Sequence, residues 1–65
     1  MDRREWLTTV EVAEMLGFGD RWVRRQIELG RLRAYAFNAG SRRALRVRRS
    51  DLEAFRKGFF RDAAG

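Results

Sequence analysis

Hydrophobic residues follow helical spacing in the first part of the chain. Thr8 is followed three residues later by Glu11, the spacing of a capping box, which predicts a helix that begins at Thr8 or Thr9. One face of this helix carries apolar residues about one helical turn apart, namely Val12, Ala13 and Leu16. Two glycines within residues 17–19 then disfavour helix and predict a sharp turn.

A second helix is predicted from Arg21 to Leu29. Asp20 is placed to act as its N-cap, because a short acceptor side chain suits the positive end of a helix, and Gly30 suits its C-terminal stop. Val23 and Ile27 lie one turn apart and point toward the core. The opposite side of this helix holds Arg21, Arg25 and Glu28, with Trp22 and Arg24 on its flanks.

The next segment loses the helical period and alternates as strands do. Residues 32–37 predict a first strand, and Arg42–Arg48 predict a second one after a turn composition at Asn38–Ser41. On the first strand one face consists of Leu32, Ala34 and Ala36, and the other consists of Arg33, Tyr35 and Phe37. Alternation alone leaves open which of these two faces is buried. On the second strand the two faces are Leu45, Val47 and Arg46, Arg48.

A third helix closes the predicted order of elements. Ser50 and Glu53 repeat the capping-box spacing, and the apolar stripe that follows consists of Leu52, Phe55 and Phe59, with Gly58 near the helix end. Helix, tight turn, helix, hairpin and helix is the order of a winged helix-turn-helix. The predicted fold class is therefore mainly α, with a small β-hairpin as a two-stranded wing.

Positive charge is concentrated in the middle of the chain. Residues 29–50 contain seven arginines and no carboxylate, and the whole chain has a formal net charge of +6. Guanidinium groups gathered in this way favour a polyanionic partner, although charge alone does not choose among DNA, RNA and lipid head groups.

Composition narrows the class of protein further. We expect residues 1–65 to form a single domain, soluble and cytoplasmic, because 45% of the residues are hydrophobic and no apolar stretch is long enough for a membrane span. The chain has no cysteine and no histidine, so it lacks a thiol nucleophile and a histidine base. Asp51 and Glu53 both lie at a helix start, which argues against a metal pair. We therefore expect no enzyme, no cofactor and no metal.

Several motifs together resemble a known family. Residues 7–17 (Leu-Thr-Thr-Val-Glu-Val-Ala-Glu-Met-Leu-Gly), 23–25, 30–32, 42–43 and 50–55 are similar, in order and spacing, to the excisionase-like, MerR-type DNA-binding domain, over residues 6–56. This family includes phage excisionases and the DNA-binding heads of MerR-type regulators. The resemblance implies that the second helix is a recognition helix in the major groove and that the Asn38–Ser41 hairpin is a wing that lies along the DNA backbone or the minor groove. The sequence departs from the family pattern at Gly19, Trp22 and Ala44.

The recognition helix and the wing supply the candidate DNA contacts. An arginine in the major groove can donate to O6 and N7 of one guanine, whereas contacts to phosphate only position the protein. The alternatives are packing for Trp22, local pairing of Glu28 with Arg24 or Arg25, and pairing of some arginines with Glu11, Glu14 or Glu53. The candidate DNA-binding residues are Arg21, Trp22, Arg24, Arg25, Arg42, Arg43, Arg46 and Arg48.

The resemblance leads to three hypotheses for the function. The first is an excisionase (recombination directionality factor) that binds attachment-site DNA as several adjacent copies, bends it and directs an integrase toward excision. A full MerR-type regulator continues into a dimerisation helix, whereas this chain stops at Gly65, so we expect a monomer in free solution. The second hypothesis is a small MerR-like transcriptional regulator, and the third is a module whose basic face docks an acidic protein. Two of the phenylalanines 55, 59 and 60 could also join protomers.

Overall fold

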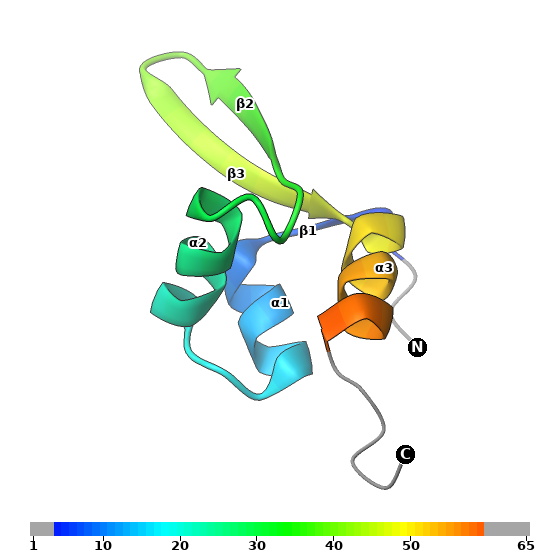
Figure 1. Ribbon diagram of the computed structural model, residues 1–65. Helices are drawn as coiled ribbons and strands as arrows, with labels where there is room; N and C mark the ends of the chain where they lie inside the picture. The colour runs from blue at the N-terminus through cyan, green and yellow to red at the C-terminus, as the bar shows by residue number, and fades with distance from the viewer. Residues whose placement is uncertain (1–3, 60–65) are drawn as a thin grey trace, which may run out of the picture.

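The computed structural model describes residues 4–59, including all side chains of that range except those of Ala39, Arg42 and Arg43. Within this range the chain forms three helices and three strands (Figure 1). Along the chain they are β1 (Trp6–Leu7), α1 (Thr9–Leu16), α2 (Asp20–Glu28), β2 (Tyr35–Ala39), β3 (Arg42–Arg48) and α3 (Arg49–Phe59). This arrangement is the predicted winged helix-turn-helix, with three helices and a small antiparallel hairpin.

Helix α1 begins as the sequence predicts. Thr8 is its N-cap, and its hydroxyl accepts a hydrogen bond from the backbone N–H of Glu11 (3.0 Å), while the Glu11 carboxylate accepts one from the Thr8 N–H (2.8 Å). Gly17 ends the helix with a φ of 79°, a left-handed conformation that glycine adopts without steric cost. The capping box and the glycine stop are thus both confirmed.

Helix α2 starts one residue earlier than the sequence predicts. Its N-cap is Gly19, which has no side chain to offer a hydrogen bond, and Asp20 is the first residue of the helix. The prediction of Asp20 as the N-cap is therefore wrong. The reason is that the Asp20 carboxylate bonds to Arg24 one turn later and not to the backbone at the helix start. At the other end Gly30 has a φ of 76° and donates its N–H to the carbonyl of Ile27 (3.0 Å).

The sheet has three antiparallel strands in the order β1-β3-β2. The sequence pattern predicts only the hairpin, because a strand as short as Trp6–Leu7 shows no alternation. Its partner is far along the chain: Trp6 lies opposite Arg48 and Leu7 opposite Val47. Strand β1 thereby fixes the start of the chain against the central strand.

The hairpin is shifted and its loop is shorter than predicted. Strand β2 begins at Tyr35, and Leu32 lies instead in the turn after α2, where its N–H donates to the carbonyl of Gln26 (3.2 Å) and its side chain is buried. The loop is Gly40–Ser41, since Ala39 already pairs with Arg42. Gly40 has a φ of 66°, which suits a two-residue hairpin loop.

Helix α3 also begins before its predicted cap. The helix includes Arg49, whose backbone N–H donates to the carbonyl of Glu5 (2.8 Å), so Ser50 lies inside the helix and does not cap it. Gly58 lies within the helix as well and does not end it. The start of α3 is therefore set by the β1 segment rather than by a local capping box.

The hydrophobic core lies where the three helices meet one face of the sheet (Figure 1). The hairpin of β2 and β3 extends beyond the helices, which leaves both of its faces without a helix near the loop. Among the described residues, no helix is long and apolar enough to cross a membrane. The buried apolar side chains are Leu7, Val12, Ala13, Val23, Leu32, Val47, Leu52 and Phe55.

Candidate nucleic-acid interface

The outward side of α2 carries most of the predicted recognition residues. Val23 and Gln26 are buried, so residues on the opposite side of the helix are directed to solvent. A shallow surface depression of about 770 Å³ lies there. Its lining consists of Arg21, Trp22, Arg24, Arg25 and Glu28, which places every recognition-helix candidate in one continuous region.

Two of the three arginines on α2 are held by carboxylates of the same helix. The Nε atom of Arg24 donates to Asp20 at 2.8 Å, and a guanidinium nitrogen of Arg25 lies 4.0 Å from Glu28. Arg21 is exposed and forms no ion pair with a described residue. The side chains of Arg24 and Arg25 remain 56% and 66% exposed, so a ligand in the depression can contact them.

The carboxylate of Asp20 accepts a hydrogen bond from Arg24 at the start of α2. The hydroxyl of Thr9 and then the guanidinium of Arg24 stabilise its charged form, and they lower the pKa of Asp20 below its usual value. Thr9 is a buried residue of α1. The hydrogen bond to Asp20 restricts the directions that the Arg24 side chain can take.

Trp22 packs into an aromatic cluster at the turn between α1 and α2. Its ring stacks on Phe18 with a centroid distance of 4.3 Å and meets the rings of Phe55 and Phe59 edge-on at 6.1 and 5.5 Å. These contacts join α2 to α3, and they are worth about 0.5–1.5 kcal/mol per aromatic pair. These contacts show that Trp22 packs against neighbouring aromatic rings. Its ring is half-buried, and a contact between Trp22 and DNA stays a prediction.

Arg46 and Arg48 of β3 lie on the face of the sheet that is turned away from the helices, since they alternate with the buried Val47. Arg46 donates to the carbonyl of Leu45 (2.9 Å), and Arg48 donates to the carboxylate of Glu5 (2.8 Å) while its guanidinium lies 5.5 Å from the Trp6 ring. The bond to Glu5 raises the pKa of Arg48. The side chains of Arg42 and Arg43, the two remaining wing candidates, lie outside the described residues.

The local pair of Glu28 with Arg25 agrees with the alternative considered on sequence grounds, whereas the partners of Glu11 and Arg48 differ from those considered there. Glu11 pairs with Arg4, near the start of the chain, and Arg48 pairs with Glu5, so neither pair involves Glu14 or Glu53. Glu5 precedes a strand that the sequence pattern does not reveal, which is why this partner was missed. Sequence reasoning also missed Arg33, whose guanidinium lies 5.4 Å from the Tyr35 ring. The shared face of Arg33 and Tyr35 in the alternation was the available signal.

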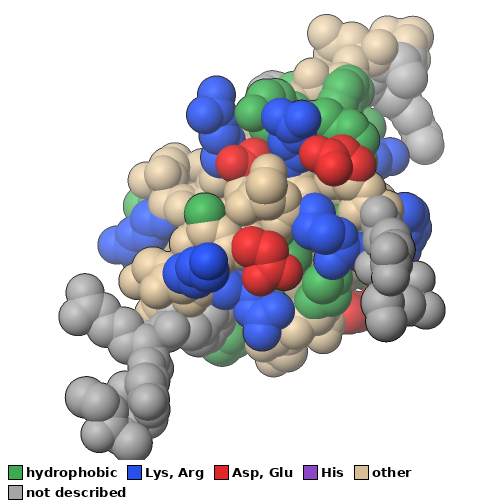
Figure 2. Space-filling view, turned by 90° about the vertical axis from the view of Figure 1, so that its right-hand side faces the viewer, with side chains coloured by type: hydrophobic (Ala, Val, Ile, Leu, Met, Phe, Trp, Pro, Cys, Tyr) green, Lys and Arg blue, Asp and Glu red, His purple; other side chains and the backbone are tan. Residues whose placement is uncertain are grey.

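Charge is distributed unevenly over the elements. Helix α2 contains three arginines but also Asp20 and Glu28, and α3 likewise mixes both signs. Figure 2 shows this mixture on the α3 side of the molecule, where acidic side chains lie among the basic ones. The excess positive charge belongs to residues 29–50, which run from the end of α2 through the hairpin (Figure 1).

The order of the elements and the exposed arginine face of α2 agree with a comparison against known families. A model of a family described as the helix-turn-helix domain matches residues 6–58. The chain belongs to this family. As a helix-turn-helix domain it binds DNA in a sequence-specific manner, and DNA is its partner. A search of curated proteins found no match.

We predict that acid weakens this helix-turn-helix unit. Hydrogen bonds from the backbone and hydroxyl of Thr8 and the charge of Arg4 lower the pKa of Glu11, and Thr9 and Arg24 lower that of Asp20. A lowered folded-state pKa contributes stability above the unfolded value, and this stability is lost as pH falls through the folded value. The thermal midpoint of unfolding should therefore decrease as the pH is lowered below about 5.

A pair of variants checks the origin of this acid response. Glu11→Gln and Asp20→Asn should reduce stability near neutral pH and flatten the decline in the thermal midpoint between about pH 5 and pH 3. Glu14→Gln removes an exposed carboxylate from the same helix α1 without touching the cap, and it serves as the control. Circular dichroism melts at a series of pH values measure the effect, and an unchanged decline in both variants would contradict the assignment.

Proposed function

We propose that this helix-turn-helix protein is an excisionase, a recombination directionality factor that binds attachment-site DNA as adjacent copies and bends it. The proposal holds that the resulting DNA shape directs an integrase toward excision. The observation that carries it is the exposed arginine face of α2 beside a basic hairpin, together with the similarity of residues 6–56 to excisionase-like sequences.

In this proposal each part of the surface has a distinct task. Helix α2 enters the major groove, where Arg21 and Arg25 each donate to O6 and N7 of a guanine. Arg24, held by Asp20 at 2.8 Å, contacts a phosphate at the groove edge. The wing follows the backbone, with phosphate contacts from Arg42, Arg43, Arg46 and Arg48.

The size of the surface argues for several copies on one DNA segment. One short recognition helix offers few base contacts, and each discriminating base pair supplies only about 1–3 kcal/mol. A single copy therefore distinguishes its site weakly from unrelated DNA. When copies on neighbouring sites also contact one another, each bound copy raises the effective concentration of the next copy at its site, so the total affinity for DNA increases. A row of such copies can also bend the DNA.

A footprinting titration on attachment-site DNA tests this proposal. With rising protein concentration, protection should spread across adjacent sites of similar sequence within a narrow concentration range, and the DNA should show increased bending in a circular-permutation gel assay. Protection confined to one isolated site, with no change in bend, would overturn the excisionase proposal. That outcome would favour a small transcriptional regulator that uses the same surface.

A further inference from the structure

Trp22 supplies the apolar part of the depression on the outward side of α2. Among the described residues that line this depression, Arg21, Arg24, Arg25 and Glu28 carry a charge and Trp22 does not. The arginines suit phosphates and the polar edges of bases. The indole ring suits neither, and the proposed function gives it no task.

The ring lies near the end of α2 that reaches bases in a helix-turn-helix. Trp22 is the third residue of α2, and the N-terminal residues of a recognition helix are those that contact base edges. Trp22 and Arg25 are three residues apart, so their side chains lie next to each other on the helix surface, about 5–6 Å apart at Cβ. Base pairs are stacked about 3.4 Å apart, so the two side chains reach base pairs that are at most about two steps apart.

The indole ring is fixed by aromatic residues outside α2. Phe18, in the turn between α1 and α2 (Figure 1), stacks on it with an angle of 19° between the ring planes, and Phe59 of α3 meets it at 74°. Phe55 is buried in the core and stacks on Phe59 at a centroid distance of 5.1 Å. Because the ring is held before DNA arrives, its contact with DNA costs little conformational entropy.

One group in the major groove matches a rigid apolar surface of this kind. The base edges there present polar donors and acceptors, and the C5-methyl group of thymine is the apolar exception. Burial of this methyl group against the ring removes apolar surface from water. A polar base edge in the same place would lose its hydrogen bonds to water, which costs free energy. The ring therefore favours thymine over the other three bases.

We propose that Trp22 is a specificity-determining residue that selects a thymine through its C5-methyl group. This thymine lies within about two base pairs of the guanine that Arg25 contacts. The inference rests on one part of the proposed function, the placement of α2 in the major groove. It adds to the DNA site a base that the arginines do not account for.

Replacement of thymine by deoxyuridine tests the proposal, because it removes the methyl group and keeps the base pair. The probe is a duplex that wild type enriches from a random pool, with each of its thymines replaced singly. The Arg25 guanine is the position at which Arg25→Ala loses its preference. In fluorescence anisotropy titrations, one replacement near that guanine should weaken wild-type binding about fourfold, the effect of exposing one methyl group to water.

Variants of the aromatic cluster assign this effect to Trp22. In Trp22→Ala, the ratio of affinities for the thymine and deoxyuridine duplexes should fall to near one, and the ratio cancels any loss of folded protein. Trp22→Gln keeps a long side chain beside Phe18 but replaces the ring by a polar amide, and it should give the same result. Phe59→Ala is the matched control, because it removes a ring of the same cluster that is 42% exposed and outside the depression. It should keep the wild-type ratio.

The outcomes separate this inference from the function on which it rests. If wild type enriches no motif, α2 does not read bases, and the proposed function and the inference both fail. A motif without thymine, or one whose thymines all tolerate deoxyuridine, would overturn the methyl contact alone. Weaker binding of Trp22→Ala to both duplexes with an unchanged ratio would indicate a sugar or phosphate contact and would also overturn it. Protection of one isolated site in the footprinting titration would overturn the excisionase proposal, whereas the fourfold loss would still support the methyl contact.

Discussion

An Arg21→Ala/Arg25→Ala double variant is expected to lose its preference for its DNA site while it keeps its fold. Both side chains lie on the exposed side of α2, and neither contributes to the buried core. A bidentate contact to guanine is worth about 1–3 kcal/mol, so the loss of two should weaken specific binding by roughly 1.5 to 4 orders of magnitude. Binding to unrelated duplex DNA should fall much less, since only two positive charges are removed.

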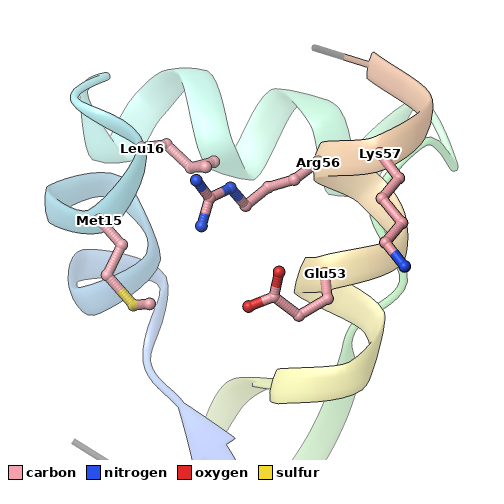
Figure 3. Close-up of a pocket in the computed structure, with 5 residues that line it drawn as sticks. All are labelled: Met15, Leu16, Glu53, Arg56 and Lys57. Carbon is pink, nitrogen blue, oxygen red and sulfur yellow. The ribbon is translucent and has the colours of Figure 1, made fainter. Parts of the chain in front are cut away.

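The matched control for this variant is Arg56→Ala/Lys57→Ala. It removes the same two positive charges from exposed positions on α3, which line the groove beside α1 in Figure 3. Fluorescence anisotropy with a single-site duplex and an unrelated duplex gives the specificity ratio of each protein. Equal losses in the two double variants would show that α2 contributes charge alone and would contradict its role in reading bases.

Leu52→Ala is expected to cause a large loss of stability. Leu52 is fully buried and anchors α3 against the core, and Leu→Ala at such a position costs about 2–5 kcal/mol. A domain of this length has a free energy of unfolding of only about 3–10 kcal/mol at about 0.05–0.15 kcal/mol per residue. The substitution therefore removes a large part of the total stability. Urea denaturation followed by circular dichroism measures the change.

Leu29→Ala is the matched control for the core substitution. The same side chain is shortened, but Leu29 is 46% exposed at the C-terminal end of α2. Its cost should stay below about 1 kcal/mol, because surface substitutions away from special features change stability little. A loss of less than about 1 kcal/mol for Leu52→Ala would mean that α3 is not packed as the structure shows.

Local signals in the sequence were enough to predict the helices and the hairpin. The capping box at Thr8 and the glycine stops at Gly17 and Gly30 act within a few residues, so they can be recognised without the fold. The second strand, Arg42–Arg48, has the predicted bounds because it alternates over seven residues. These features carry the order of elements that identifies the fold class.

The features that sequence reasoning missed depend on contacts between distant parts of the chain. Strand β1 exists because Trp6 pairs with Arg48, and Arg49 begins α3 because it bonds to Glu5. Asp20 suited an N-cap by type, but the presence of Arg24 one turn later gave its carboxylate another partner. The backbone at the helix start and the Arg24 side chain compete for the Asp20 carboxylate. Three-dimensional geometry decides between them, and residue type and spacing in the sequence do not specify that geometry.

The sequence predicts which arginines belong to the candidate site, but it does not predict how the aromatic side chains around them are arranged. Helical periodicity placed Arg21 and Arg25 on one outward side, and the structure puts them in the same surface depression. Periodicity could not show that Trp22 stacks on Phe18, nor that Arg33 joins Tyr35 on the outer sheet face. Both arrangements involve aromatic residues from separate elements.

The central claim is that the outward side of α2 reads DNA sequence, and selection from a pool of random duplexes tests it most directly. Wild type and the Arg21→Ala/Arg25→Ala variant are carried through the same rounds, and the enriched sequences are compared. We predict that wild type enriches a short motif containing guanines and that the variant loses preference at those guanine positions. The same motif enriched by both proteins, or no motif enriched by wild type, would contradict the claim.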